Sequence, residues 1–156
     1  EVRMMKTHYL SPEYWKWLQS HPEHARNHFT QTSQTALEKA KSGEMESARQ
    51  TAGEAYEIAQ AVLLSLQAPE TSPASQRKDL TAYGAAAIQL ARSHAATGNI
   101  EDAATCLDAA SQQIYALAPL FALHPELLTM LQQITFSLQK GLAFYQRQTL
   151  SSRVLH

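Results

Sequence analysis

Apolar residues recur along most of this chain at alternating spacings of three and four, which is the period of one face of a helix. Such stripes occupy the segments 25–40, 76–97, 100–117 and 127–145. The longest stripe contains seven positions: Met45, Ala48, Ala52, Ala55, Ala59, Val62 and Leu66. No run of five or more residues alternates as a strand does. The pattern predicts an all-α fold of five longer helices and one short helix, arranged as antiparallel helical hairpins.

Prolines and glycines mark where these helices begin and end. A polar residue followed by proline and glutamate, which is typical of a helix start, occurs at Ser11-Pro12-Glu13, His21-Pro22-Glu23 and His124-Pro125-Glu126. Gly43 and Gly98 each follow a helical segment, as C-terminal caps do. These signals predict one domain over residues 1–150, with a short helix at about 12–20, the main loop at 68–75 and a loose tail at 151–156.

Small side chains dominate the stripes, since the chain contains 25 alanines. Alanine on a helix face allows a neighbouring helix to approach closely. We therefore expect a tight crossing of the two helices joined at Gly98, with Ala91 facing Ala103.

Composition and charge narrow the possible functions. The chain is 44% apolar and 17% charged, with 13 basic and 14 acidic residues and a net charge of -1. This balance argues against a nucleic-acid or anionic-membrane surface, and the apolar runs are shorter than the ~20 residues that span a bilayer. The single cysteine, Cys106, excludes an internal disulfide and, without a secretory-type apolar stretch, favours the cytoplasm.

Few residues are candidates for a metal site or for catalysis. His21, His24 and His28 fall at i, i+3 and i+7, which is ligand-like spacing on a helix, but a closed metal site needs around four ligands. We interpret these histidines as a solvated polar face and expect no metal or other cofactor. Cys106 is expected to be a buried, inert thiol and His94 an interior or groove histidine. No phosphate loop, dinucleotide fingerprint or nucleophile elbow occurs, so the sequence predicts no enzyme.

One local pattern is more specific. Between residues 90 and 110 it contains a large-small pair, a glycine turn, and then a small, a bulky and a small residue, namely Leu90-Ala91, Gly98, Ala103, Leu107 and Ala110. This segment resembles a tetratricopeptide repeat, and a weaker copy occurs at Gly43, Ala48, Ala52 and Ala55. The two glycine turns are 55 residues apart, rather than a multiple of about 34, and no closing proline follows the stronger copy. A plain helix bundle is the alternative architecture.

The resemblance implies a protein-interaction, adaptor or chaperone-like module that binds a peptide or helix in a groove formed by the first helices of its hairpins. The positions that would face this groove are Ile88, Arg92 and Ala96 in the stronger copy, and Ser33, Leu37 and Lys41 in the weaker one. Arg92 and Lys41 are suited to hold a carboxylate or an acidic motif. The alternative function is a regulatory or structural bundle that self-associates, for example as a homodimer.

Aromatic residues cluster near the N-terminus, where Tyr9, Tyr14, Trp15 and Trp17 are four of the twelve in the chain. In a short helix, Tyr14, Trp17 and Leu18 share one face, which leaves Trp15 on another. We interpret this helix as a cap on the end of the stack. The alternative is that Trp15 contacts a partner, since large aromatics dominate interfaces.

Overall fold

The structure, a computed structural model, describes residues 8–65 and 72–155, and the side chains of these residues up to Ser151. The described residues form six α-helices, one short 3-10 helix and no strand, which confirms the all-α prediction. In chain order the elements are α1 (Pro12–Gln19), α2 (Pro22–Lys41), α3 (Met45–Leu63), α4 (Pro73–Ala96), α5 (Ile100–Tyr115), η2 (Ala118–Phe121) and α6 (Pro125–Leu155).

Helix starts follow local sequence chemistry. The Ser11 side chain caps α1 by accepting the backbone N–H of Tyr14, 3.2 Å away, and Ser72 caps α4 in the same way. Because Pro73 suits the first helical position, α4 begins there. The predicted main loop at 68–75 is therefore misplaced, since α3 already ends at Leu63 and residues 73–75 are helical. Residues 68–71 of the predicted loop lie outside the described part.

The two predicted glycine turns have the same geometry. Gly43 and Gly98 have φ of 82° and 83°, a left-handed conformation that glycine adopts without a steric penalty. Each turn closes with a Schellman pair of backbone bonds: Gly43 N to Ala40 O, Glu44 N to Lys39 O, Gly98 N to Ala95 O and Asn99 N to His94 O. The hairpins α2/α3 and α4/α5 therefore reverse direction in the same manner.

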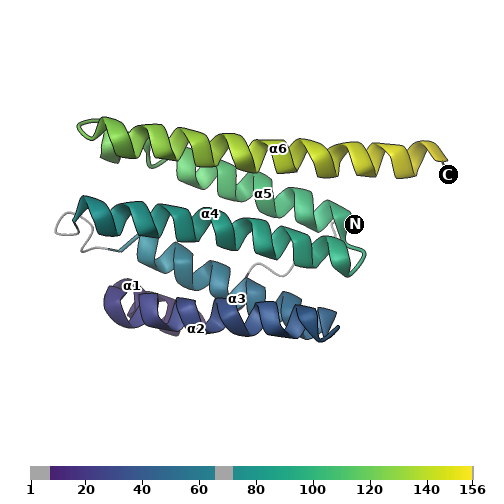
Figure 1. Ribbon diagram of the computed structural model, residues 1–156, viewed down its shortest axis with the longest axis horizontal. Coiled ribbons are helices and arrows are strands. Elements are labelled where there is room, and N and C mark those ends of the chain that lie inside the picture. Colours follow the sequence, from purple (N-terminus) through teal and green to yellow (C-terminus); the bar gives the residue numbers. More distant parts are fainter. Residues whose placement is uncertain (1–7, 66–71, 156) are drawn as a thin grey trace.

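The hairpins lie side by side, and α6 packs on α4 and α5 (Figure 1). Helices α2 and α4 run in the same direction, since each is the first helix of its hairpin (Figure 1). Helix α1 packs on α3 and α2 at one end of the assembly. No helix among the described residues combines the length and apolar character needed to cross a membrane.

Alanines and a few large side chains fill the core. Ala91 and Ala103 are 1% and 0% exposed and belong to one apolar cluster with Leu107 and Tyr83, as the predicted tight hairpin requires. Met45 departs from the prediction, because it is 41% exposed although it begins the longest apolar stripe. It is the first residue of α3, beside the turn at Gly43, where the stripe extends beyond the core.

The C-terminal segment is helical, so the predicted loose tail at 151–156 is wrong for residues 151–155. No glycine or proline follows Gly141, and nothing in the local sequence ends the helix. His156 lies outside the described residues. The C-terminal part of α6 thus extends well beyond the N-terminal end of α5 (Figure 1).

Candidate functional site

A cleft follows the parallel helices α2 and α4, with α3 beneath it. Toward the C-terminal ends of α2 and α4 it has a volume of about 510 Å³. Its walls are mostly small or apolar side chains: Ser33, Ala36, Leu37, Ala40, Met45, Ala48, Ala85, Ile88, Gln89, Arg92, Ser93 and Ala96. Alanines do not fill the space between the helices, and this leaves room for bulky side chains of another molecule.

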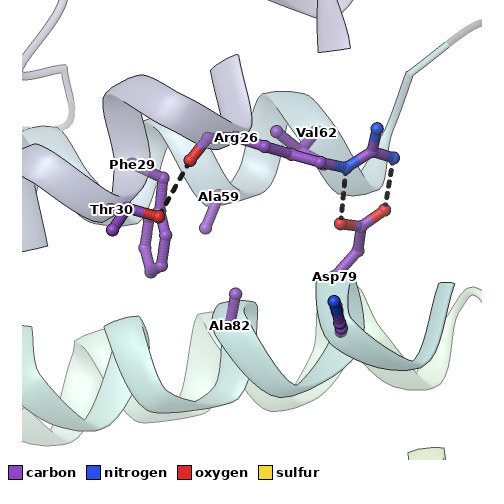
Figure 2. A pocket seen from close by; sticks show the side chains of 8 residues that line it. Arg26, Phe29, Thr30, Ala59, Val62, Asp79 and Ala82 are labelled. Carbon is purple, nitrogen blue, oxygen red and sulfur yellow. Dashed lines mark hydrogen bonds and ion pairs between the residues drawn. The ribbon is translucent and has the colours of Figure 1, made fainter. Parts of the chain in front are cut away.

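A smaller hollow of about 200 Å³ lies between the same helices nearer their N-terminal ends (Figure 2). Apolar side chains from α2 and α3 line it, including Phe29, Ala59 and Val62. At one side, Arg26 Nε donates to Asp79 Oδ1 at 3.0 Å and an Arg26 terminal nitrogen donates to Oδ2 at 2.8 Å (Figure 2). This bidentate pair ties α2 directly to α4.

The two hollows lie along one line. Within the larger hollow, the Ser33 hydroxyl donates to Gln89 Oε1 at 3.4 Å, and this second polar contact joins α2 to α4. The lining residues on α2 extend from Arg26 to Ala40. At 1.5 Å per residue, this distance is about 21 Å. The cleft is therefore long enough for about four helical turns or a short extended segment.

The cleft exposes apolar surface. Leu37 is 45% exposed and Met45 is 41% exposed, and both line the larger hollow with the half-buried Ile88. Large apolar side chains that point into a concave surface are typical of binding grooves. The larger hollow is thus the more suitable part of the cleft for an apolar ligand.

Positive charge predominates along the cleft. Its lining includes Arg26, Lys78 and Arg92 but only one acidic residue, Asp79. The hydrogen bonds to Asp79 raise the pKa of Arg26 and neutralise its charge locally. Within residues 8–65 and 72–151, neither Lys78 nor Arg92 forms an ion pair. Each end of the cleft therefore carries one cation available to a ligand.

The structure brings most of the sequence-predicted groove residues together. Ser33, Leu37, Ile88, Arg92 and Ala96 all line the larger hollow. Lys41 is exposed at the end of α2 and does not line it. Sequence reasoning missed the half of the cleft around the Arg26 and Asp79 pair. Extending the same helical spacing backwards along α2 and α4 would have reached that half.

Helix α1 turns a different face inward from the one predicted. Leu18 is fully buried, and Trp15, one turn earlier, packs half-buried beside it. Trp17 is the exposed tryptophan, at 41%, and its ring stacks on His21 at 3.9 Å between centroids. The prediction that Trp15 lies away from the packed face is therefore wrong. Trp15 and Trp17 lie on opposite sides of the face that Tyr14 and Leu18 share, and packing on α2 and α3 turned the Trp15 side inward.

The three N-terminal histidines contact the aromatic side chains of α1. His28 Nδ1 lies 2.9 Å from the Tyr14 hydroxyl, and His24 meets the edge of the Trp17 ring. Among the described residues, no three histidine, cysteine, aspartate or glutamate side chains converge as metal ligands would. His21 and His24 are exposed, as the predicted solvated face requires, whereas His28 is half-buried, and all three also contact aromatic rings of α1.

The remaining chemical candidates are buried behind the cleft. His94 is 3% exposed, with the Tyr9 hydroxyl 3.5 Å from its Nε2, so it is the interior histidine expected rather than a groove residue. Cys106 is also buried, and burial raises the pKa of its thiol to about 12. The thiol is therefore protonated near neutral pH, as an inert cysteine is.

Comparison of the chain with protein-family models, with curated proteins and with solved structures found no match.

Proposed function

We propose that this protein is a non-catalytic interaction module that binds a segment of another protein in the cleft between α2 and α4. The observation that carries the proposal is the larger hollow, whose walls combine alanines with the exposed Leu37 and Met45. Two hairpins with the same glycine-turn geometry place their first helices side by side around it. This arrangement supports the resemblance to tetratricopeptide repeats and the use of its groove for recognition.

The charges of the cleft indicate the chemistry of the partner. Lys78 and Arg92 lie 14 residues apart on α4, which corresponds to about 21 Å along the helix. A partner helix of about four turns that carries a carboxylate near each end would match both cations. Its apolar side chains, repeating every three or four residues, would enter the space above the alanines. The favoured partner is therefore an acidic amphipathic helix.

The ionisable groups of the cleft favour binding over catalysis. They are Arg26, Lys78, Asp79 and Arg92, and the Asp79 carboxylate is already held by Arg26. Cys106 and His94, which have more suitable chemistry for catalysis, are buried on other faces of their helices.

Selection from a displayed library of 16-residue peptides on the full chain tests the proposal. We expect enriched peptides to have apolar residues at helical spacing and acidic residues near both ends. Binding of a synthetic enriched peptide, measured by fluorescence anisotropy, should weaken at least about tenfold with Arg92→Glu, since each 1.4 kcal/mol is a factor of ten. Ala85→Arg, which fills the larger hollow, should have a similar effect.

Arg147→Glu is the matched control, because Arg147 is an exposed cation on α6 that does not line the cleft. Equal weakening by Arg147→Glu would show that binding depends only on overall charge. A library that yields no peptide sensitive to Ala85→Arg would contradict the proposed function.

Self-association is the second candidate, and the exposed face of α6 favours it. Phe136 and Phe144 are 63% and 48% exposed there, and no acidic residue follows Glu126 in the chain. A second copy would have to cover these rings. Sedimentation equilibrium over a hundredfold concentration range tests this candidate, which predicts a dimer that Phe136→Glu returns to monomer. A monomer at all concentrations would contradict it.

A further inference from the structure

The segment that precedes α1 is anchored against the helix bundle. The backbone N–H groups of Tyr9 and Leu10 donate to the two carboxylate oxygens of Glu57 on α3, each at 2.8 Å. The Tyr9 ring lies directly on Gly53, where a Cβ atom would come within 2.3 to 2.5 Å of three ring carbons. The Tyr9 hydroxyl reaches 3.5 Å from Nε2 of His94 on α4. Tyr9 therefore contacts both hairpins.

The contacts with Glu57 and Gly53 hold Tyr9 in a defined position. Glu57 is 5% exposed, and a buried carboxylate is costly unless charge-assisted hydrogen bonds stabilise it. Two of these bonds come from successive backbone groups of the N-terminal segment. Gly53 supplies the space for the ring, because any larger residue would overlap it. Backbone and side chain thus hold Tyr9 in one position.

The ring also packs against the main apolar cluster, to which Ala103 and Cys106 of α5 belong. Burial raises the pKa of Tyr9 to about 12, and the nearby Cys106 and Asp102 of α5 contribute to this rise. Helices α3 and α5 have few direct contacts, and farther along, Gln60 of α3 donates to Gln113 of α5 at 3.0 Å. Tyr9 therefore fills one end of the seam between the second helices of the two hairpins.

This end of the seam lies behind the larger hollow. On α4, Ser93 and Ala96 line the hollow, whereas His94 between them faces Tyr9. On α3, Ala48 lines the hollow and Gly53, just over one turn later, contacts the ring. Tyr9 and the hollow thus lie at one level, on opposite sides of the packed pair α3 and α4.

We propose that the Tyr9 ring is a wedge, that is, a side chain that keeps α3 and α5 apart. When the ring occupies the position described above, it determines the distance between α2 and α4, and thereby the affinity of the cleft for its ligand. Helix pairs repack as rigid bodies, so removing volume between α3 and α5 allows these helices to approach. The two hairpins would then rotate about the contact between α3 and α4. Because the cleft lies on the opposite side of this contact, the distance between α2 and α4 would increase. The coupling to affinity rests on the proposed function, whereas the change in separation is a property of the unliganded protein.

The separation is measured first, on the unliganded full chain, by double electron-electron resonance between spin labels at Gln31→Cys on α2 and Thr81→Cys on α4. Both positions are exposed and neither lines the cleft. We expect Tyr9→Ala to shift the distance distribution to longer values. Tyr9→Phe keeps the ring and removes only the hydroxyl, so it should retain the original distribution.

A second variant covers the case in which Tyr9→Ala fails to fold. Glu57→Gln keeps the shape of the side chain but loses the charge that holds the two backbone N–H groups. The Tyr9 ring should then occupy its position in a smaller fraction of molecules, and the distribution of distances between the spin labels should broaden. Distributions that match the original in every folded variant, with circular dichroism showing intact helices, would overturn the wedge.

The coupling is measured next, with a cleft-binding peptide from the library selection. Tyr9→Ala should change its Kd at least about fivefold, the lower end of typical allosteric couplings, and Tyr9→Phe should not. A longer distance with an unchanged Kd would overturn the coupling. A longer distance with no peptide binding to any variant would overturn the proposed function instead, so the two failures are distinguishable.

Discussion

The guanidinium of Arg26 on α2 holds the carboxylate of Asp79 on α4 through two parallel hydrogen bonds, across the cleft that separates these helices. Asp79 is 9% exposed, so the pair stands at the edge of the core. It is the closest polar connection between the two first helices and helps to determine how far apart they lie. The geometry of the cleft therefore depends on residues 53 positions apart in the sequence.

Removing Arg26 should lower the free energy of unfolding more than removing one member of an exposed ion pair does. Arg26→Ala leaves the nearly buried Asp79 without its partner, and we expect a loss of about 1–3 kcal/mol in the free energy of unfolding. Arg49→Ala is the control, because its partner Glu46 is 70% exposed, and it should cost less than about 1 kcal/mol. Urea denaturation of each variant provides the measurement. Equal losses would contradict the prediction.

The same pair should show energetic coupling. Once Asp79→Ala has removed the carboxylate, Arg26→Ala should cost less than it does alone, because no buried charge is left unpaired. A double-mutant cycle of the four proteins measures the coupling, which we expect to be about 0.5–3 kcal/mol. Additive losses would show that the two hydrogen bonds contribute nothing to stability.

Gly53→Ala should destabilise the native chain but stabilise a chain that carries Tyr9→Ala. In the native chain the added methyl overlaps the Tyr9 ring, so the substitution should destabilise the protein. In a Tyr9→Ala background the ring is gone, and alanine should then stabilise α3 by about 0.5–1 kcal/mol through its helix propensity. Thermal unfolding of both pairs tests this expectation. Stabilisation in the native chain would show that the ring does not lie on Gly53.

Ala103→Leu should destabilise the α4/α5 hairpin. Ala103 is fully buried, and extra methylene groups there should cost about 1–3 kcal/mol through overpacking. Ala109→Leu on the same helix is the matched control, since Ala109 is exposed and should tolerate leucine with little loss. Denaturant unfolding with unchanged m-values provides the comparison. A neutral Ala103→Leu would contradict the close helix crossing.

Stability should fall steeply in alkaline solution. Burial raises the pKa of both Tyr56 and Tyr83 above 10.0, the ordinary value for tyrosine, so above that pH the unfolded chain releases protons that the folded chain retains. The contribution of these two tyrosines is therefore fully present below pH 10 and is lost as pH rises, by at most about 1.4 kcal/mol per pH unit for each tyrosine. The buried Cys106 thiol adds a loss of the same sign that begins near pH 9. Denaturant unfolding from pH 8 to 11.5 measures the slope.

The contribution of one tyrosine can be isolated. Tyr83→Phe removes one of the retained protons and should make the alkaline slope less steep, even though it also lowers stability at every pH. Tyr115→Phe, at a tyrosine that is 67% exposed, is the control for removing a tyrosine hydroxyl from the surface. A slope that Tyr83→Phe does not alter would contradict the assignment.

The amino-acid sequence by itself determined the local structure. Proline after a capping residue placed the start of α1, and the glycine turns at Gly43 and Gly98 followed from the need for a left-handed residue at the end of a helix. These features depend on neighbours within one or two turns, so they can be predicted from short segments. Helical spacing likewise placed Ile88, Arg92 and Ala96 on one face of α4, the face that lines the cleft.

Only the tertiary structure decided how those faces meet. Trp15 and Trp17 lie on opposite sides of the α1 face that Tyr14 and Leu18 share, and packing against α2 and α3 determined which of them turns inward. The ring of Tyr9 lies on Gly53, 44 residues away, because the fold brings the N-terminal segment to the seam between two hairpins. Such contacts join residues whose separation along the chain carries no signal of their proximity. Their selection depends on packing all the helices at once.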